Sequence, residues 1–129
     1  QIKVLRDVHR TTLIAGIDLG DDFTRDPNDI VDGNADIDSV IVLGEMVDTS
    51  IAAGIDAGGP AYQYGDSDDY ALNNHIGASR IYRIIVRKRI RSTQLSGEYF
   101  AITADDGIDT LLSAGRPFTG APGVMVQHY

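Results

Sequence analysis

Thr49-Ser-Ile-Ala-Ala-Gly-Ile-Asp56 is preceded in the chain by a near-copy, Thr11-Thr-Leu-Ile-Ala-Gly-Ile-Asp18. A segment rich in Asp and Gly follows each of the two copies. Self-similarity at a fixed period is the sequence signature of repeat architectures. We therefore interpret the chain as a repeated β-unit that projects acidic loops.

The repeat extends upstream of these two stretches. Residues 2–18 align with residues 40–56 without gaps, and a third copy begins at Ile84. The first positions of each copy alternate, and β-branched residues dominate them, as expected of strands. Four apolar columns are predicted, and their members are Ile2/Val40/Ile84, Val4/Val42/Val86, Val8/Met46/Ile90 and Leu13/Ile51/Leu95.

The predicted fold is all-β. Stacked copies with aligned apolar columns favour a parallel β-helix, or β-solenoid, of about three coils with long Asp/Gly-rich loops. A β-sandwich is the alternative, because short strands at regular spacing also predict one. We expect one domain, 1–129, with repeats at about 1–38, 39–82 and 83–109 and a partial repeat at 110–129. In that partial repeat, residues 110–115 resemble the Thr11 and Thr49 stretches, and the tail is expected to be a cap or a docking strand.

The amino-acid composition excludes several classes of function. The chain has 11 basic and 19 acidic residues, and 17 of the acids are Asp, which favours loops over helices. A net charge of -8 argues against a nucleic-acid binder, and no segment is long and apolar enough to predict a membrane span. Cysteine is absent, which excludes disulfides and thiolate metal sites. Because the chain opens on Gln1 in strand-like sequence, we expect a processed chain or an excised segment.

Both acidic loops are candidate cation sites. Ca²⁺ takes six to eight oxygen ligands, and short Asp side chains in a Gly-containing loop can supply several of them. The candidate ligands are Asp18, Asp21, Asp22, Asp26 and Asp29 in loop one (18–38) and Asp56, Asp66, Asp68 and Asp69 in loop two (56–74). The alternating Asp32, Asn34, Asp36 and Asp38 could form another site. The alternative is that Asp makes turns and keeps the surface soluble.

The two Ala-Gly-Ile-Asp loops resemble calcium-binding β-helix repeats of large secreted or surface proteins of bacteria, planctomycete-like ones especially. Loop two matches that family pattern at Asp56, Gly58, Tyr64, Gly65, Asp68 and Asp69, and it departs at Pro60. Loop one matches at Asp18, Gly20, Asp22, Phe23 and Asp29. The resemblance implies calcium sites in the loops and a structural role outside the cell or on its surface.

A basic run lies after loop two, where six of the 11 basic residues fall between Arg80 and Arg91. It is either a charged, solvated strand face or a docking surface for acidic loops of a neighbouring subunit or an anionic polysaccharide. Catalysis has weak support, because the adjacent Asp pairs and the three histidines form no recognisable triad or glycosidase pattern.

These observations predict a non-enzymatic structural repeat domain of an extracellular or cell-surface assembly, stabilised by Ca²⁺. Because an uncapped stack exposes unpaired backbone, we expect a homo-oligomer, a head-to-tail assembly or a filament subunit. The alternative is a carbohydrate-binding or polysaccharide-cleaving β-helix module, in which calcium and the basic run would act on an acidic glycan.

Overall fold

The computed structural model describes residues 1–18, 30–31, 35–59, 63–72, 79–95 and 97–128. All regular secondary structure in the described residues consists of β-strands, so the all-β prediction is confirmed. The strands are rich in Val, Ile and Thr, whose branched side chains suit a pleated, half-buried surface.

Three sheets contain most of the strands. The first sheet, in spatial order, consists of β1 (Ile2–Val4), β6 (Val40–Val42), β11 (Arg80–Val86), β14 (Gly107–Ser113) and β15 (Arg116–Pro117). The second consists of β12 (Ile90–Arg91), β7 (Met46–Val47) and β2 (Val8–His9). The third consists of β16 (Val124–His128), β13 (Phe100–Ala104), β8 (Ser50–Ala53) and β3 (Thr12–Ala15). All their pairs are parallel except β14 with β15.

Two short antiparallel pairs lie at the bases of the acidic loops. The first joins β4 (Ile17–Asp18) to β5 (Ile30–Val31), and the second joins β9 (Ile55–Asp56) to β10 (Tyr70–Ala71). Each pair follows directly on the Ala-Gly sequence that the two copies share, at the positive-φ glycines Gly16 and Gly54.

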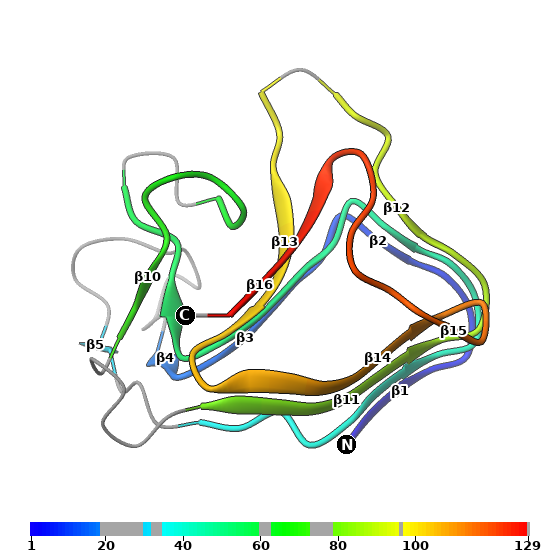
Figure 1. Ribbon diagram of the computed structural model, residues 1–129, viewed down its shortest axis with the longest axis horizontal. Coiled ribbons are helices and arrows are strands. Elements are labelled where there is room, and N and C mark those ends of the chain that lie inside the picture. The colour runs from blue at the N-terminus through cyan, green and yellow to red at the C-terminus, as the bar shows by residue number, and fades with distance from the viewer. Residues whose placement is uncertain (19–29, 32–34, 60–62, 73–78, 96, 129) are drawn as a thin grey trace.

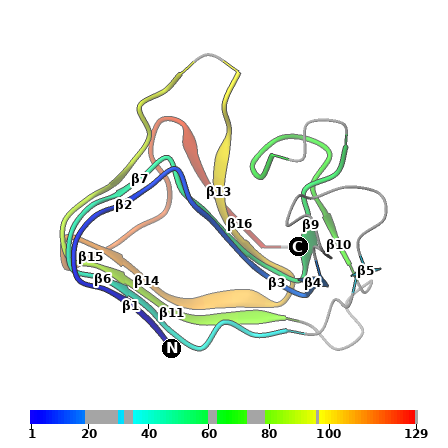
Figure 2. The same ribbon diagram turned by 180° about the vertical axis from the view of Figure 1, so that it is seen from behind.

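Successive segments of the chain use the three sheets in the same order. Residues 2–15 (unit 1), 40–53 (unit 2) and 80–104 (unit 3) each contribute one strand to every sheet, whereas residues 107–128 (unit 4) contribute only to the first and third. In Figures 1 and 2 the strands of successive units overlie one another, and the sheets follow the sides of a triangular outline.

Three of the four predicted columns are confirmed by the strand register. Val4, Val42 and Val86 are direct neighbours across β1, β6 and β11. The same register joins the predicted members Ile2, Val40 and Ile84, and in the second sheet Val8, Met46 and Ile90. A shift of the alignment by one residue would have turned these side chains to the opposite face.

The fourth column was wrong in its third member. Ile51 pairs with Leu13 as predicted, but its neighbour in unit 3 is Ile102, while Leu95 is 47% exposed. The gapless alignment assumed equal unit lengths, whereas unit 3 makes an extra excursion between β12 and β13 (Figure 1). Positive φ angles at Gln94 and Gly97 turn the chain there.

The assignment of residues 110–115 was also wrong. Thr110 pairs with Arg83 in the first sheet, whereas Thr12 and Ser50 of the compared stretches lie in the third sheet. The following Ala114 and Gly115 have positive φ and turn the chain from β14 into antiparallel β15. The tail then returns as β16, which pairs with β13 of unit 3 in the same chain.

The core lies inside the outline. Units 2 and 3 supply most of it, and its largest fully buried side chains are Met46, Ile51, Ile81, Ile84 and Ile102. Unit 1 contributes only partly buried members, among them Val4, Val8 and Leu13. The interior is therefore less covered at the unit 1 end.

Candidate metal site

Loop two leaves the strand stack through the β9–β10 pair, which places Asp56 opposite Tyr70. The Asp56 carboxylate is 1% exposed and is held by two hydrogen bonds. Its Oδ1 accepts the backbone N–H of Gly58 at 3.0 Å, and its Oδ2 accepts the Tyr70 hydroxyl at 2.8 Å. These bonds make Asp56 the anchor of the loop.

Three carboxylates of the same loop converge. One oxygen from each of Asp66, Asp68 and Asp69 lies within 4.8 Å of the others, so the cluster could hold a metal ion. Asp69 Oδ2 accepts the Gly65 N–H at 2.8 Å, whereas the Oδ1 atoms of Asp68 and Asp69 are buried and have no hydrogen-bond partner. Buried polar atoms normally have a partner, so these two oxygens are available as ligands for a cation.

The pKa values of the cluster also favour a bound cation. Burial first, and then the charges of Asp66, Asp68 and Asp56, raise the pKa of Asp69 to about 6, against the lowering effect of the hydrogen bond from the Gly65 N–H. Burial, followed by a hydrogen bond with Asp68, also raises the pKa of Asp66. Carboxylates held this close disfavour one another's ionised form, and a bound cation would remove that cost.

Two glycines allow this packing. Gly58 has a φ of +58°, and a Cβ at this position would lie 2.5 Å from the Asp68 carbonyl oxygen. Gly65 has a φ of +102°, and a Cβ there would lie 3.0 Å from the carbonyl oxygen of Phe100 in unit 3. Glycine is therefore needed where loop two closes on itself and where it meets the stack.

The donor set suits a hard cation. Three carboxylates offer up to six oxygens, and backbone carbonyls or water can complete the six to eight that Ca²⁺ takes. Metals that prefer imidazole or thiolate have no such donors in the cluster. The chemistry of the cluster thus fits Ca²⁺.

The predicted ligand set is only partly assembled here. Asp66, Asp68 and Asp69 come together, whereas Asp56 anchors the loop beside them. Asp18 lies in β4, and the other loop-one candidates, Asp21, Asp22, Asp26 and Asp29, lie outside the described residues, as do Asp32 and Asn34. Asp36 instead accepts the backbone N–H of Arg80 in unit 3 at 2.8 Å.

Sequence reasoning missed a second use of Asp. Asp7 Oδ1 accepts the N–H of Glu45 in unit 2 at 2.7 Å. Asp48 accepts both the N–H and the hydroxyl of Thr93 in unit 3, at 2.7 and 2.6 Å. The available signal was their place at the turns between short strands, where Asp readily binds backbone N–H groups.

The basic run mostly contacts neighbouring units. Arg80 forms ion pairs with Asp106 and Asp109, both at 2.7 Å. Arg89 and Arg91 both contact Glu45 of unit 2, at 3.1 and 3.2 Å. Hydrogen bonds from Arg91 and Arg89 hold the pKa of Glu45 below its usual value. Arg83 also donates its Nε–H to the Ser39 hydroxyl at 3.4 Å, so four of the six basic residues of the run contact neighbouring parts of the stack.

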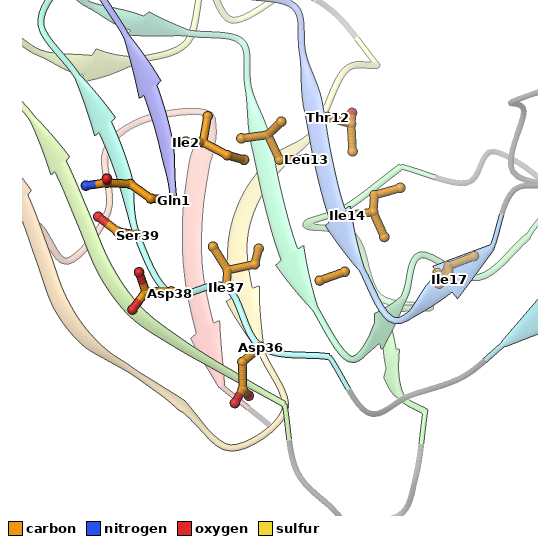
Figure 3. Close-up of a pocket in the computed structure, with 11 residues that line it drawn as sticks. Gln1, Ile2, Thr12, Leu13, Ile14, Ile17, Asp36, Ile37, Asp38 and Ser39 are labelled. Carbon is orange, nitrogen blue, oxygen red and sulfur yellow. The ribbon is translucent and has the colours of Figure 1, made fainter.

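Hollows mark the unit 1 end of the stack. One of about 350 Å³ lies among the column residues of units 1 and 2, among them Val4, Val8 and Met46. Another, of about 500 Å³, is lined by Ile2, Leu13 and Ile37, which Figure 3 shows gathered at its centre. A smaller polar hollow on the side of the stack is lined by Arg10, Asp48, Ser50, Gln63, Tyr64, Glu98 and Tyr99.

Comparisons of the chain with protein-family models, with curated proteins and with solved structures find no match. Within the described ranges, no helix has the length and apolarity needed to cross a bilayer.

Proposed function

We propose that the chain is a non-enzymatic structural domain, a β-solenoid that serves in an extracellular or cell-surface assembly and is stabilised by Ca²⁺ in its acidic loops. One observation carries the proposal: three successive units contribute strands to three parallel sheets, in one register. Such an arrangement lets each unit cover the apolar face of the next, as solenoid repeats do.

The calcium part of the proposal rests on the carboxylates of loop two. Asp69 is only 8% exposed and has one carboxylate oxygen without a partner, next to two further carboxylates. When bound, Ca²⁺ would neutralise the cluster and hold loop two against unit 3. The chain itself contributes the Gly58 turn, the Asp56 anchor and the Gly65 contact.

The chain has no Cys, so engineered disulfides can test the stacking without interference. Three neighbouring pairs, one in each sheet, are Lys3/Ile41, His9/Val47 and Thr12/Ser50. Each pair changed to Cys is expected to cross-link on oxidation, because neighbouring strands lie about 5 Å apart, within disulfide range. The control pair, Lys3 with Ile85, lies two strands apart and should not cross-link. If the fold were a β-sandwich, at least one of the three neighbouring pairs should fail to cross-link.

The calcium part is tested by urea unfolding with Ca²⁺ and with a chelator. A concentration one hundred times the dissociation constant should add about 2.7 kcal/mol to the free energy of unfolding. Asp69→Asn should abolish the part of this gain that comes from the cluster, while Asp109→Asn, which changes an exposed carboxylate outside both acidic loops, should keep it. Equal gains in the two variants would refute the assignment of the site.

Loop geometry provides an independent control. Gly58→Ala should weaken Ca²⁺ binding because its Cβ would displace Asp68. Gly97→Ala imposes a similar backbone strain, with a φ of +78°, but its Cβ would have nothing within 4 Å. Equal calcium affinities of the two variants would mean that Asp68 is not a ligand.

The carbohydrate alternative has one supporting observation. Tyr99 is 52% exposed at the polar hollow that Arg10, Asp48, Gln63 and Glu98 also line, and aromatic faces can stack on sugar rings. Binding of an acidic glycan that is lost in Tyr99→Ala and kept in Tyr82→Ala would favour this alternative. The ion pairs of Arg80, Arg89 and Arg91 within the chain speak against the basic run as the glycan site.

A further inference from the structure

We propose that the polar hollow on the side of the stack binds one neutral hexose ring of a glycan, without a metal ion. The hollow has a volume of about 230 Å³ and lies between loop two and units 1, 2 and 3. This binding goes beyond the structural function and does not involve the calcium site. It depends on the stacking of the units, and it differs from the carbohydrate alternative in the charge of the ligand.

The walls of the hollow are parts of the chain that lie far apart in the sequence. Arg10 and Asp48 follow the second-sheet strands of units 1 and 2, and both have positive φ angles, +46° and +48°. Glu98 and Tyr99 lie in the excursion of unit 3 between β12 and β13, and Gln63 lies in loop two. The excursion that breaks the repeat pattern thus supplies one wall, and only the folded stack brings these residues together.

Tyr99 gives the hollow an aromatic surface. It is 52% exposed, whereas Tyr64 in the same lining is 3% exposed and donates its hydroxyl proton to the Ile55 carbonyl at 3.1 Å. Gln63 Oε1 accepts the backbone N–H of Tyr99 at 3.1 Å, which holds the Tyr99 backbone against loop two. An exposed aromatic ring on a fixed backbone can pack its face against the C–H groups of a sugar, and the apolar area buried there favours binding.

The hollow also has polar groups with unused hydrogen-bonding capacity. Glu98 Oε2 is buried and has no hydrogen-bond partner within the described part of the chain, and it lies 3.6 Å from Arg10 Nη2, too far for a normal hydrogen bond. Ser50 Oγ accepts the Ala101 N–H at 3.1 Å, which leaves its own proton to donate. The Gln63 amide uses its oxygen for the backbone contact, which leaves its NH₂ group as a donor. Sugar hydroxyls both donate and accept, so they can bind all of these groups.

The charges of the hollow select a neutral ligand. One guanidinium, that of Arg10, lies near two carboxylates, those of Glu98 and Asp48. Burial opposes the effect, but hydrogen bonds from Thr93 and the charge of Arg10 hold the pKa of Asp48 below its usual value, so Asp48 stays ionised. Negative charge is therefore in excess, and an acidic sugar would be repelled. A neutral hydroxyl, in contrast, can accept from Arg10 and donate to Glu98 without separating them.

The size of the hollow and the contact between Arg10 and Glu98 disfavour other small ligands. The volume is below the roughly 300–1,000 Å³ of sites for drug-sized molecules, which suits a single ring. A free amino acid could place its carboxylate on Arg10 and its ammonium on Glu98, but it would have to separate an ion pair that the chain already forms. A small amino acid also has no ring face to lay on Tyr99. The hexose is therefore the best fit.

Binding is tested by NMR titration of the full chain with the methyl glycosides of glucose, galactose and mannose. One ring makes few contacts, so we expect a dissociation constant of about 1 mM for at least one of them. The backbone amide signals of Gln63, Tyr99 and Phe100 should shift, and a chelator should leave the affinity unchanged. The methyl glycoside of glucuronic acid, which has an additional carboxylate, should bind about tenfold more weakly than that of glucose.

Variants of the chain locate the contact. Tyr99→Ala should weaken binding about tenfold or more, whereas Tyr99→Phe, which restores the ring, should recover most of the affinity. The control is Tyr82→Ala, which removes an exposed tyrosine of β11. Glu98→Gln should weaken binding about tenfold, because it removes a charged acceptor. Its matched control is Glu45→Gln, which also changes a carboxylate that contacts arginine between units, but outside the hollow.

The proposal is overturned if none of the three neutral glycosides shifts these amides at about 10 mM, or if Tyr99→Ala binds as Tyr82→Ala does. It is also overturned if the glucuronic acid glycoside binds more tightly than the glucose one, because the ligand is then acidic. Displacement of the glycoside by free alanine would show a zwitterionic ligand, and loss of binding with a chelator would place the site in loop two, and either result overturns it as well.

The engineered disulfides separate this proposal from the structural one. Their failure would refute the stacking on which the hollow depends. Disulfide formation without glycoside binding would refute only the hexose site, and unfolding midpoints of the variants show whether a loss of binding reflects a loss of the fold.

Discussion

The unit 1 end and the unit 4 end of the stack differ in how their strand edges and apolar interior are covered. At the unit 1 end, no strand of the described residues pairs with the outer edges of β1, β2 and β3, and Ile2 is 40% exposed. At the unit 4 end, antiparallel β15 pairs along β14, and the chain then crosses the outline before β16 (Figure 1). Phe118 and the buried Val124 fill the interior there.

The difference shows that the end of a strand stack is covered only where a further segment of the chain packs across it. Edge strands with unpaired N–H and C=O groups invite pairing, and proteins protect them with short antiparallel strands, proline or covering loops. The unit 4 end uses such devices, including Pro117 on its edge strand. The unit 1 end carries the exposed Lys3 and Arg6, and charged side chains of this kind protect a sheet edge from unwanted pairing.

The largest expected effect comes from proline in the first sheet. Ile41→Pro removes an N–H that bonds unit 2 to unit 1, and we expect a loss of about 3 kcal/mol or more in the free energy of unfolding. Lys3→Pro, its neighbour in register, removes only an outward N–H and should cost far less. Urea unfolding of both variants measures the difference, and equal losses would mean that the two edges are not distinct.

Phe118→Ala tests the covered end. Phe118 donates its N–H to Leu111 at 3.0 Å, and its ring packs on the core, half-buried. Loss of the ring should cost about 2 kcal/mol and expose the interior to a hydrophobic dye. Phe118→Leu should keep most of the stability. If Phe118→Ala behaves like Tyr82→Ala, whose side chain is exposed, the ring is not a cover.

The pH dependence of the free energy of unfolding, measured without calcium, reports on loop two and not on the two ends of the stack. The pKa of Asp69 is about 6 in the folded chain, against the ordinary value of 3.8 for an Asp side chain, so between these pH values the folded chain holds a proton that the unfolded chain releases. The free energy of unfolding should therefore rise by about 1 to 2 kcal/mol as the pH falls from 7 to 4.5. Urea unfolding with a chelator measures it.

The control is Asp69→Asn, which cannot ionise and should flatten this part of the profile. Added Ca²⁺ should oppose the trend, because the cation binds the ionised cluster and lowers its pKa. A profile that is unchanged in Asp69→Asn would show that another group titrates.

Glu45→Gln should have the smallest effect. The Glu45 carboxylate contacts Arg89 and Arg91, but the Arg89 side chain is 71% and the Arg91 side chain 40% exposed, and ion pairs with solvent-exposed partners contribute little. Its pKa is lowered by these contacts, so their contribution is present above the usual value of 4.5 and is lost as the pH falls below it. Unfolding midpoints at low and high salt should converge for the native chain and the variant. A shift as large as that of Phe118→Ala would contradict this.

The sequence alone determined the repeat and most of its register. Side chains alternate with a period of two, so the aligned β-branched positions at Val4, Val42 and Val86 had to share a face. The Asp and Gly residues of loop two likewise predicted which residues assemble, since a tight carboxylate cluster needs short side chains and turns. These features depend on local geometry, which neighbouring residues encode.

Tertiary structure decided the rest. Ile102 took the place predicted for Leu95 because the length of an excursion between strands has no local period. Asp56 anchors loop two beside the cluster and does not join it, because the Gly58 N–H and the Tyr70 hydroxyl bind its two carboxylate oxygens in the folded chain. The difference between the two ends is also tertiary, because only the crossing of residues 116–124 covers one of them.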